Sequence, residues 1–317
     1  MLISGDAHGI ACAVGYLKSA QPVAFPTETI YGLGACASDP AGIAALYTLK
    51  GRPRFNPLIV HVNTREQAEA FARFDARARL IADAFWPGPL TLVLPLVPDQ
   101  TAVHALATAG LETVAVRVPA HKMAQDLIAA AGPLVAPSAN KSGTLSPTTP
   151  LHVATSFGPD APPILAGGPT RAGVESTILD LSVYPAVILR AGSITPDDLA
   201  PLLGYTPTVV HDILDEKGRP KSPGLLLRHY APRTKIRLHA VDVCPGEAVL
   251  AFGPARFLGM RMDCPPPARG RCRSVSEGEG GDPSVSGLVT PSDPASLDHL
   301  PLSGGGYARD VIAPDRF

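Results

Sequence analysis

The chain has 317 residues, which is enough for one large domain or two modest ones. Hydrophobic residues make up 45% and aromatic residues only 5%, so a nucleic-acid surface built on stacked aromatic rings is disfavoured. The 27 basic and 28 acidic side chains give a formal net charge of -1, which counts against a protein that binds nucleic acid through charge alone.

The five cysteines are scattered along the chain, at positions 12, 36, 244, 264 and 272, with no C-x-x-C pair. This spacing argues against a zinc ribbon and against a disulfide framework. The N-terminus carries Asp6 where a signal peptide needs positive charge, and no segment has the roughly 18 uninterrupted apolar residues of a membrane span. We therefore expect a reduced, soluble, cytoplasmic protein that does not contact membranes.

Helices and strands are predicted to alternate over residues 1–205. In chain order the pattern predicts a helix at 10–17, a strand at 22–26, a polar loop at 27–29, a helix from 39 to about 51, a strand at 58–62, one or two helices within 65–85, strands at 90–96 and 113–118, a helix at 123–131, strands at 134–136, 164–166, 176–181 and 187–189, and a helix at 197–203. This alternation is typical of an α/β sheet with helical cover.

The character of the chain changes after residue 205. Residues 206–232 are rich in proline, glycine and charge, which is typical of a linker. Strands at 235–238 and 248–252 predict a second, smaller domain over 233–317. From about residue 259 no helical or strand period is present, and the composition resembles a disordered tail. We interpret 259–317 as disordered, or as the product of a shifted reading frame or a decayed domain.

A basic turn follows the helix that ends near residue 51. Lys50, Arg52 and Arg54 stand at alternate positions directly before a buried strand, and the neighbouring prolines and glycine stiffen the turn. Arginine forks grip phosphate oxygens in pairs and lysine adds a point charge, so the cluster fits a polyphosphate. The alternative is a solvated loop whose cations complement the C-terminus of the helix.

Two polar side chains stand where the strand at 134–136 ends. Ser138 and Asn140 occupy a place where α/β sheets commonly bind ligands, and their donors and acceptors suit a nucleotide phosphate or ribose. The alternative for both residues is an N-cap and turn cluster without a ligand.

The segment from Pro26 to Gly34 is polar at its start and lies between apolar stretches. This position places Thr29 and Tyr31 at a pocket, while the alternative interpretation makes Glu28 the cap of a nearby helix. The segment 175–177 repeats the same theme of a glutamate followed by hydroxyl side chains.

His61 and Arg117 lie inside otherwise apolar predicted strands. A cation in such a strand costs free energy unless it faces a pocket or a partner. Arg117 therefore indicates a pocket, whereas a histidine whose hydrogen bonds serve only the structure remains an alternative for His61.

Several common enzyme motifs are absent from the sequence. There is no P-loop, and the segment 32–37 matches only a loose dinucleotide pattern without the acidic residue that should follow about 20 positions later. No hydrolase triad signature, H-E-x-x-H or kinase motif set occurs. No carboxylate cluster is fit to hold a metal by itself, so magnesium would arrive with a nucleotide.

Taken together and in order, these motifs resemble the YrdC-like family of threonylcarbamoyl-AMP synthases in its long two-domain form. The resemblance rests on segments 26–34, 50–53, 56–58, 136–140, 146–148, 175–177 and 189–192, and it covers about residues 1–205. It implies a YrdC-like twisted mixed sheet with helical cover and a smaller Rossmann-like C-terminal domain. From about residue 259 this chain departs from that second domain, which is therefore expected to be incomplete or abnormal.

The resemblance also implies roles for individual residues. Those that would face L-threonine are Thr29, His61, Arg117, Ser138 and Ser176. Those that would line the ATP site are Lys50, Arg52, Asn56, Thr113, Asn140, Thr148 and Arg190, with Tyr230 closing over it from a linker that resembles the family's lid. Lys50 and Arg52 would carry the catalytic charge stabilisation.

The reaction implied by the resemblance converts L-threonine, bicarbonate and ATP into threonylcarbamoyl-AMP and pyrophosphate, for N6-threonylcarbamoyladenosine formation in tRNA. Mg²⁺ would enter with ATP, and downstream tRNA threonylcarbamoyl-transfer proteins would receive the product. One alternative is a double-stranded-RNA-binding module without catalysis; the near-zero net charge disfavours it but leaves room for a weak RNA contact. Another is a carbamoyl-transfer domain such as occurs in hydrogenase maturation proteins, whose zinc-finger segments this chain lacks.

Overall fold

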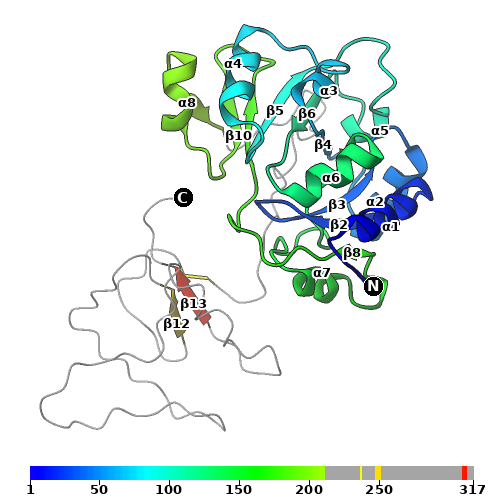
Figure 1. Cartoon of the computed structure of the whole chain (residues 1–317). Helices are drawn as coiled ribbons and strands as arrows, with labels where there is room; N and C mark the ends of the chain where they lie inside the picture. Colours follow the sequence, from blue (N-terminus) through cyan, green and yellow to red (C-terminus); the bar gives the residue numbers. More distant parts are fainter. Residues whose placement is uncertain (211–235, 238–246, 251–308, 313–317) are drawn as a thin grey trace, which may run out of the picture. The chain divides into compact units, whose positions relative to one another are not determined.

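The computed structural model describes residues 1–210, 236–237, 247–250 and 309–312 (Figure 1). By its contacts the chain divides into two units, Met1–Ala231 and Pro232–Phe317. The predicted linker and lid lie outside the described residues from position 211 onwards, and Tyr230 lies outside them too. No helix in the described ranges is long and apolar enough to cross a membrane.

The first unit is built on one mixed sheet. In spatial order its strands are β1 (Leu2–Ile3), β8 (Ile164–Leu165), β2 (Val23–Pro26), β3 (Tyr31–Cys36), β7 (Leu134–Val135), β4 (Ile59–His61), β6 (Thr113–Arg117), β5 (Leu90–Pro95), β9 (Thr177–Asp180), β10 (Val187–Arg190) and β11 (Thr208–Val209). Parallel and antiparallel neighbours alternate irregularly: β4 is parallel to β6, for example, and β5 is antiparallel to β6. The predicted mixed α/β sheet is confirmed.

Helices surround this sheet (Figure 1). They are α1 (Ala7–Lys18), α2 (Pro40–Lys50), α3 (Arg65–Glu69), α4 (Ala76–Phe85), α5 (Ala105–Thr108), α6 (Lys122–Ala131), α7 (Pro150–Phe157) and α8 (Pro196–Leu203), with a short 3₁₀ turn at Gly158–Asp160. The ends of α2 follow the expected local chemistry. Asp39 accepts hydrogen bonds from the N–H groups of Ala41 and Gly42, and Gly51 ends the helix with a φ of 59°, where glycine has no Cβ penalty.

Apolar side chains pack the helices onto the sheet in two large buried clusters. Helices α1 and α6 contact each other and β2, and Leu17, Phe25 and Leu127 belong to one cluster. The larger cluster joins α2 and α4 to the central strands through Ile43 and Ile81, among others. The strands that carry polar side chains at their ends are therefore held in place by apolar burial.

Strand β3 was not predicted: the sequence analysis gave a polar loop at 27–29 and only a loose glycine pattern at 32–37. The loop is confined to the few residues before Tyr31, and Gly34 pairs with Val23 of β2. A Cβ on Gly34 would lie 2.9 Å from an atom of the Phe25 ring, so glycine lets this ring pack across the neighbouring strand. The short elements β1, β11 and α5 and the proline-led helix α7 were also absent from the prediction, because short segments carry little periodicity.

In the second unit, β12 (Glu247–Leu250) pairs in parallel with β13 (Arg309–Ile312). The first strand overlaps the one predicted at 248–252. Strand β13 lies in the tail where no strand was predicted, and that prediction was wrong for these four residues. Ile236 and Arg237, from the middle of the strand predicted at 235–238, are not in a strand. The rest of 259–317 lies outside the described residues.

Tyr31 provides a test of this architecture. It was predicted to face a pocket, but it is fully buried, and its hydroxyl donates to the Gly168 carbonyl at 2.7 Å and accepts from the Gly167 N–H at 3.1 Å. Tyr31→Phe would leave both backbone groups unpaired, so we expect a loss of about 1–3 kcal/mol in the free energy of unfolding. Urea denaturation of the full chain measures this loss.

Tyr184→Phe is the matched control, because the Tyr184 side chain is exposed. We expect its effect to stay within about 0.5 kcal/mol. Equal losses in the two variants would contradict a special role for the Tyr31 hydroxyl.

Candidate active site

A pocket brings together side chains from several strands of the sheet and from the loops beside them. It contains about 490 Å³ of space, including the part that is open to solvent. Seven of the predicted site residues line it: Thr29, Arg52, His61, Arg117, Ser138, Ser176 and Arg190. Lining residues to which the sequence analysis gave no role are Thr27, Ile30, Gly32, Ile59, Ala136, Pro137 and Glu175. The sequence signal for Thr27 and Glu175 was present, since both stand in the quoted motifs, but no argument singled them out.

Strand order explains why these distant residues converge. His61 at the end of β4 is the register partner of Arg117 at the end of β6, because the two strands are parallel. Arg190 ends β10, and Ser176 directly precedes β9, which is antiparallel to β10. Ser138 follows β7 and forms an isolated bridge with Gly32 on β3. Residues in or next to β4, β6, β7, β9 and β10 thus converge on one pocket.

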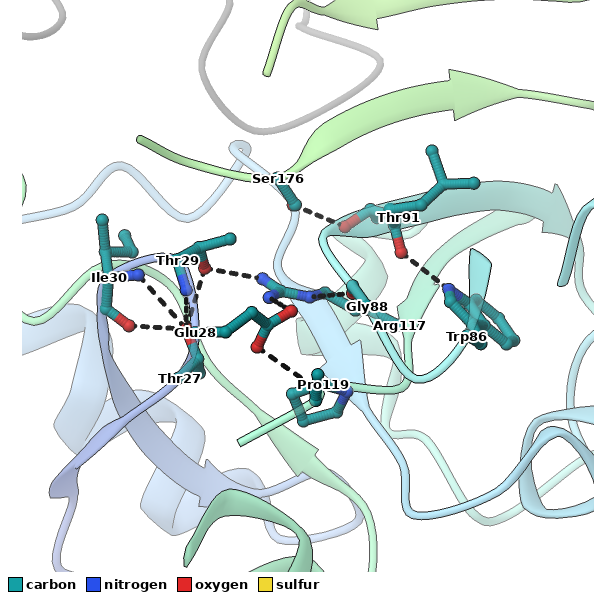
Figure 2. A network of polar contacts seen from close by, with 12 residues as sticks. Thr27, Glu28, Thr29, Ile30, Trp86, Gly88, Thr91, Arg117, Pro119 and Ser176 are labelled. Carbon is teal, nitrogen blue, oxygen red and sulfur yellow. Dashed lines mark hydrogen bonds and ion pairs between the residues drawn. The ribbon is translucent and has the colours of Figure 1, made fainter. Parts of the chain in front are cut away.

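All three nitrogens of the Arg117 guanidinium donate hydrogen bonds (Figure 2). Its Nε donates to the Gly88 carbonyl at 3.0 Å, Nη1 to Thr29 Oγ1 at 3.0 Å and Nη2 to Glu28 Oε1 at 2.5 Å. The side chain is only 4% exposed. Glu28 was considered as the cap of a nearby helix; that interpretation was wrong, because this carboxylate pairs with Arg117 and also accepts from the Ala120 N–H at 3.1 Å.

Thr27 orders the hydroxyl groups beside Arg117. Its hydroxyl donates to the Ile30 carbonyl at 2.6 Å, and Thr27 Oγ1 lies 2.8 Å from Thr29 Oγ1 (Figure 2). Thr29 Oγ1 in turn accepts from Arg117. The Thr29 hydroxyl therefore meets the pocket already bonded on both sides.

A second arginine is held in a similar way. Arg190 Nη1 forms an ion pair with Glu175 Oε2, Nη2 donates to Ser176 Oγ at 3.0 Å, and Nε donates to the Ser176 carbonyl at 3.0 Å. Ser176 Oγ is also 2.7 Å from Thr91 Oγ1, and Glu175 Oε1 accepts from Ser146 Oγ at 2.7 Å. The repeated motif of a glutamate before a hydroxyl residue thus corresponds to two arginine–carboxylate–hydroxyl units in one pocket.

His61 lies between these units as a neutral imidazole. It is 3% exposed, and burial together with the nearby Arg117 lowers its pKa to about 3. The Phe25 ring meets its edge, and Nδ1 is 3.3 Å from the Ile59 carbonyl. A neutral ring that donates from Nδ1 leaves Nε2 as an acceptor.

The basic turn is divided between interior and surface. Lys50 and Arg52 are buried, whereas Arg54 is exposed, so the solvated-loop alternative holds for Arg54 alone. Arg52 is anchored by bonds from Nε to the Asn56 carbonyl at 3.3 Å and from Nη2 to the Pro57 carbonyl at 2.9 Å.

Lys50 is directed at the backbone of the neighbouring turn. Its Nζ donates to the carbonyls of Ser138 at 2.5 Å and Asn140 at 2.6 Å. Burial and the adjacent Arg52 lower its pKa to about 7. Lys50 is not among the pocket-lining residues, and its predicted direct contact with a nucleotide stays a prediction.

The remaining described residues that were predicted to contact a nucleotide, Asn56, Thr113, Asn140 and Thr148, are not among the pocket-lining residues. Asn56 is fully buried, and neither polar atom of its side chain has a hydrogen-bond partner among the described residues. Asn140 Oδ1 is also unpartnered, although its Nδ2 bonds to Thr144, in line with the turn-cluster alternative. Thr148 Oγ1 is 3.1 Å from His152 Nδ1, and Thr113 begins β6. Unpartnered buried amide groups next to a pocket are typical of atoms that meet a ligand.

The chemistry of the pocket is that of an anion site. Three arginines are opposed by two glutamates, and hydroxyl groups and a neutral imidazole complete the wall. Within the described ranges, no group of three or more His, Cys, Asp or Glu side chains could hold a metal ion. The arrangement can bind a small ligand that carries carboxylate and phosphate groups.

Comparison with known proteins agrees with this description. The family model for Sua5, YciO and YrdC, described as "Telomere recombination", matches residues 15–192. Threonylcarbamoyl-AMP synthases of Pyrococcus abyssi and Bacillus subtilis are 44% and 43% identical over 232 and 231 residues, in each case 72% of this chain and 66% of the relative's length. The crystal structure of P. abyssi Sua5 complexed with L-threonine has a TM-score of 0.76 at 31% identity, covering 99% of this chain and 92% of that one.

The buried neutral His61 predicts a pH dependence of stability. Its pKa is about 3 in the folded chain and about 6.5 when unfolded, so the unfolded chain binds more protons between these values. The stability that depends on the neutral ring is therefore complete above pH 6.5 and is lost as the pH falls towards 3. His61→Gln removes the titration, so between pH 7 and pH 5 the wild type should lose about 2 kcal/mol more than the variant.

Urea denaturation at the two pH values measures this difference. His8→Gln is the control, because the His8 side chain is exposed, and it should keep the wild-type pH dependence. A His61→Gln variant with the full wild-type pH dependence would contradict the assignment.

Proposed function

The chain belongs to the Sua5, YciO and YrdC family, and from this premise we propose that it is an L-threonylcarbamoyladenylate synthase. It would convert L-threonine, bicarbonate and ATP into threonylcarbamoyl-AMP and pyrophosphate. One observation carries the proposal: all five residues that the family resemblance assigns to L-threonine line a single pocket together with two arginines assigned to ATP. The names of the relatives and the threonine complex of P. abyssi Sua5 support the same reaction.

The threonine end of the pocket is formed by Arg117, Thr29 and His61. Arginine pairs with carboxylates in a two-bond fork, so Arg117 would bind the threonine carboxylate. The neutral His61 ring offers an acceptor without adding a positive charge beside the substrate amine. A cationic imidazole here would repel an ammonium group and would add to the charge of Arg117.

The chemical step needs no protein nucleophile. The threonine amine would take up bicarbonate to give a carbamate with loss of water, and a carbamate oxygen would then form a bond to the α-phosphorus of ATP. The bond from that phosphorus to the bridging oxygen breaks, and pyrophosphate leaves with the electron pair. Negative charge builds up on the phosphate oxygens, and fixed cations lower the barrier to such transfers. Arg52 and Arg190 would supply this charge, held by their backbone bonds.

Lys50 would contribute through the turn that it holds. Its bonds to the carbonyls of Ser138 and Asn140 fix the residues that the resemblance places against threonine and ATP. The unpartnered Asn56 and Asn140 atoms would gain their hydrogen bonds from the nucleotide. We propose that Mg²⁺ enters bound to the phosphates of ATP, and we assign it no ligand from the protein.

The partners follow from the reaction. Threonylcarbamoyl-AMP is a reactive mixed anhydride, so a protein that transfers the threonylcarbamoyl group to tRNA must consume it. The alternative of a double-stranded-RNA-binding module is not supported by the relatives, which are named for a catalytic activity. Three arginines line a pocket. Cations inside a pocket favour the binding of small anions over the binding of a nucleic-acid backbone along a surface.

Pyrophosphate release tests the proposed reaction. Purified full-length protein with ATP and Mg²⁺ should release pyrophosphate only when both L-threonine and bicarbonate are present, because the carbamate is the nucleophile. A coupled phosphate assay with each substrate omitted in turn measures this. Release without threonine, or no release under any condition, would refute the proposal.

Arg52→Ala tests the cation assigned to the phosphates. Loss of a charged donor in a desolvated site should lower kcat by roughly a hundredfold. Arg54→Ala is the matched control from the same turn: the Arg54 side chain is exposed, and the rate should stay within about twofold of the wild type. Wild-type turnover in Arg52→Ala would contradict the assignment.

A further inference from the structure

Glu28 uses both carboxylate oxygens to join two parts of the site (Figure 2). Oε1 accepts from Arg117 Nη2 at 2.5 Å, and Oε2 accepts from the Ala120 N–H at 3.1 Å. The glutamate belongs to the loop between β2 and β3, whereas both donors belong to β6 and the segment that follows it. The side chain of Glu28 is 14% exposed, so this bridge is largely shielded from water.

The bridge determines which donors of Arg117 remain for a ligand. A guanidinium has five N–H groups, and Gly88, Thr29 and Glu28 each accept one of them, from Nε, Nη1 and Nη2 respectively. Two N–H groups remain, one on each terminal nitrogen. Two parallel donors are what a two-bond contact with a carboxylate requires.

We propose that Glu28 is a positioning residue for the substrate carboxylate: it holds Arg117 so that its two remaining donors face the pocket. This inference rests on the proposed function, which identifies the ligand as an amino acid. Glu28 itself need not touch the substrate. Its role requires two acceptor oxygens, and a glutamine offers only one.

Although glutamine and glutamate have nearly the same size, Glu28→Gln should therefore weaken the binding of L-threonine. If the amide oxygen stays on Arg117, the amide NH₂ faces the Ala120 N–H, and two donors oppose each other; the reverse orientation places NH₂ against the guanidinium. The charge effect has the opposite sign, because a less neutralised Arg117 would attract a carboxylate more strongly. The direction of the change in threonine affinity thus decides between positioning and simple charge compensation.

Glu175 supplies a matched control in the same pocket. It also bridges an arginine and a second donor, and it also loses one negative charge in a glutamine variant. Its second partner is the Ser146 hydroxyl, which can rotate and accept from an amide NH₂, whereas the Ala120 backbone N–H cannot. Glu175→Gln therefore keeps the contacts with Arg190 and Ser146, and Arg190 is assigned to ATP.

The experiment measures KM for L-threonine and for ATP, and kcat, in pyrophosphate release by the full-length wild type, Glu28→Gln and Glu175→Gln. Glu28→Gln should raise the threonine KM by roughly tenfold or more and the ATP KM by less than about threefold. Glu175→Gln should change the threonine KM by less than about threefold. An unchanged or lowered threonine KM in Glu28→Gln, or equal rises in both variants, would overturn the proposal.

Glu28→Asp keeps the charge and both acceptor oxygens at a reach one methylene shorter, and its threonine KM should lie between those of the wild type and Glu28→Gln. If Glu28→Gln does not fold, as judged by thermal unfolding without substrates, Glu28→Asp carries the test alone: a wild-type threonine KM would refute the proposal. Measurements on the wild type also distinguish a failure of the proposed function from a failure of the positioning role of Glu28. A wild type that needs no threonine for pyrophosphate release refutes the proposed function, whereas a normal wild type with an unaffected Glu28→Gln refutes only the positioning role.

Discussion

The site depends on the cost of burying arginine. Arg117 and Arg190 are almost removed from water at the ends of β6 and β10, and an unpaired guanidinium there would cost several kcal/mol. Each is therefore given a carboxylate, a hydroxyl and a backbone carbonyl. These partners remove the penalty and at the same time fix the orientation of each guanidinium. Because every buried guanidinium needs such partners, the arginines of the pocket are held in place even without a ligand.

Burial also determines the protonation state of the groups next to these arginines. His61 is neutral because burial and Arg117 both oppose its charged form, and the pKa of Lys50 falls to about 7 for related reasons. The site thus carries its positive charge on arginines, which stay protonated, and keeps the histidine as an acceptor. This distribution suits the binding of two anionic groups around a substrate amine.

A pocket of this kind suits catalysis by the positioning of substrates and by fixed charges. None of the residues that line it is a serine, cysteine or lysine nucleophile paired with a base, and the proposed reaction does not require one. In the proposed reaction, fixed donors that do not need to reorganise as charge develops would supply the stabilisation, and convergence of two substrates in one cavity would supply the proximity. The apolar clusters beneath the strands keep these donors in register.

The sequence by itself determined the local structure and the kinds of residue in the site. Asp39 and Gly51 delimit α2 through capping chemistry that acts within a few residues, and the apolar runs around His61 and Arg117 identified their strands. The motifs identified seven lining residues, of which His61 and Arg117 stand in apolar strands and Arg52 in the turn after a helix. Only the tertiary structure decided what those residues do to one another. The Glu28–Arg117 pair spans 89 positions and the Lys50 contact with Asn140 spans 90, so no local pattern encodes them. Strand order brings these residues together, and strand order is set by the packing of the whole sheet.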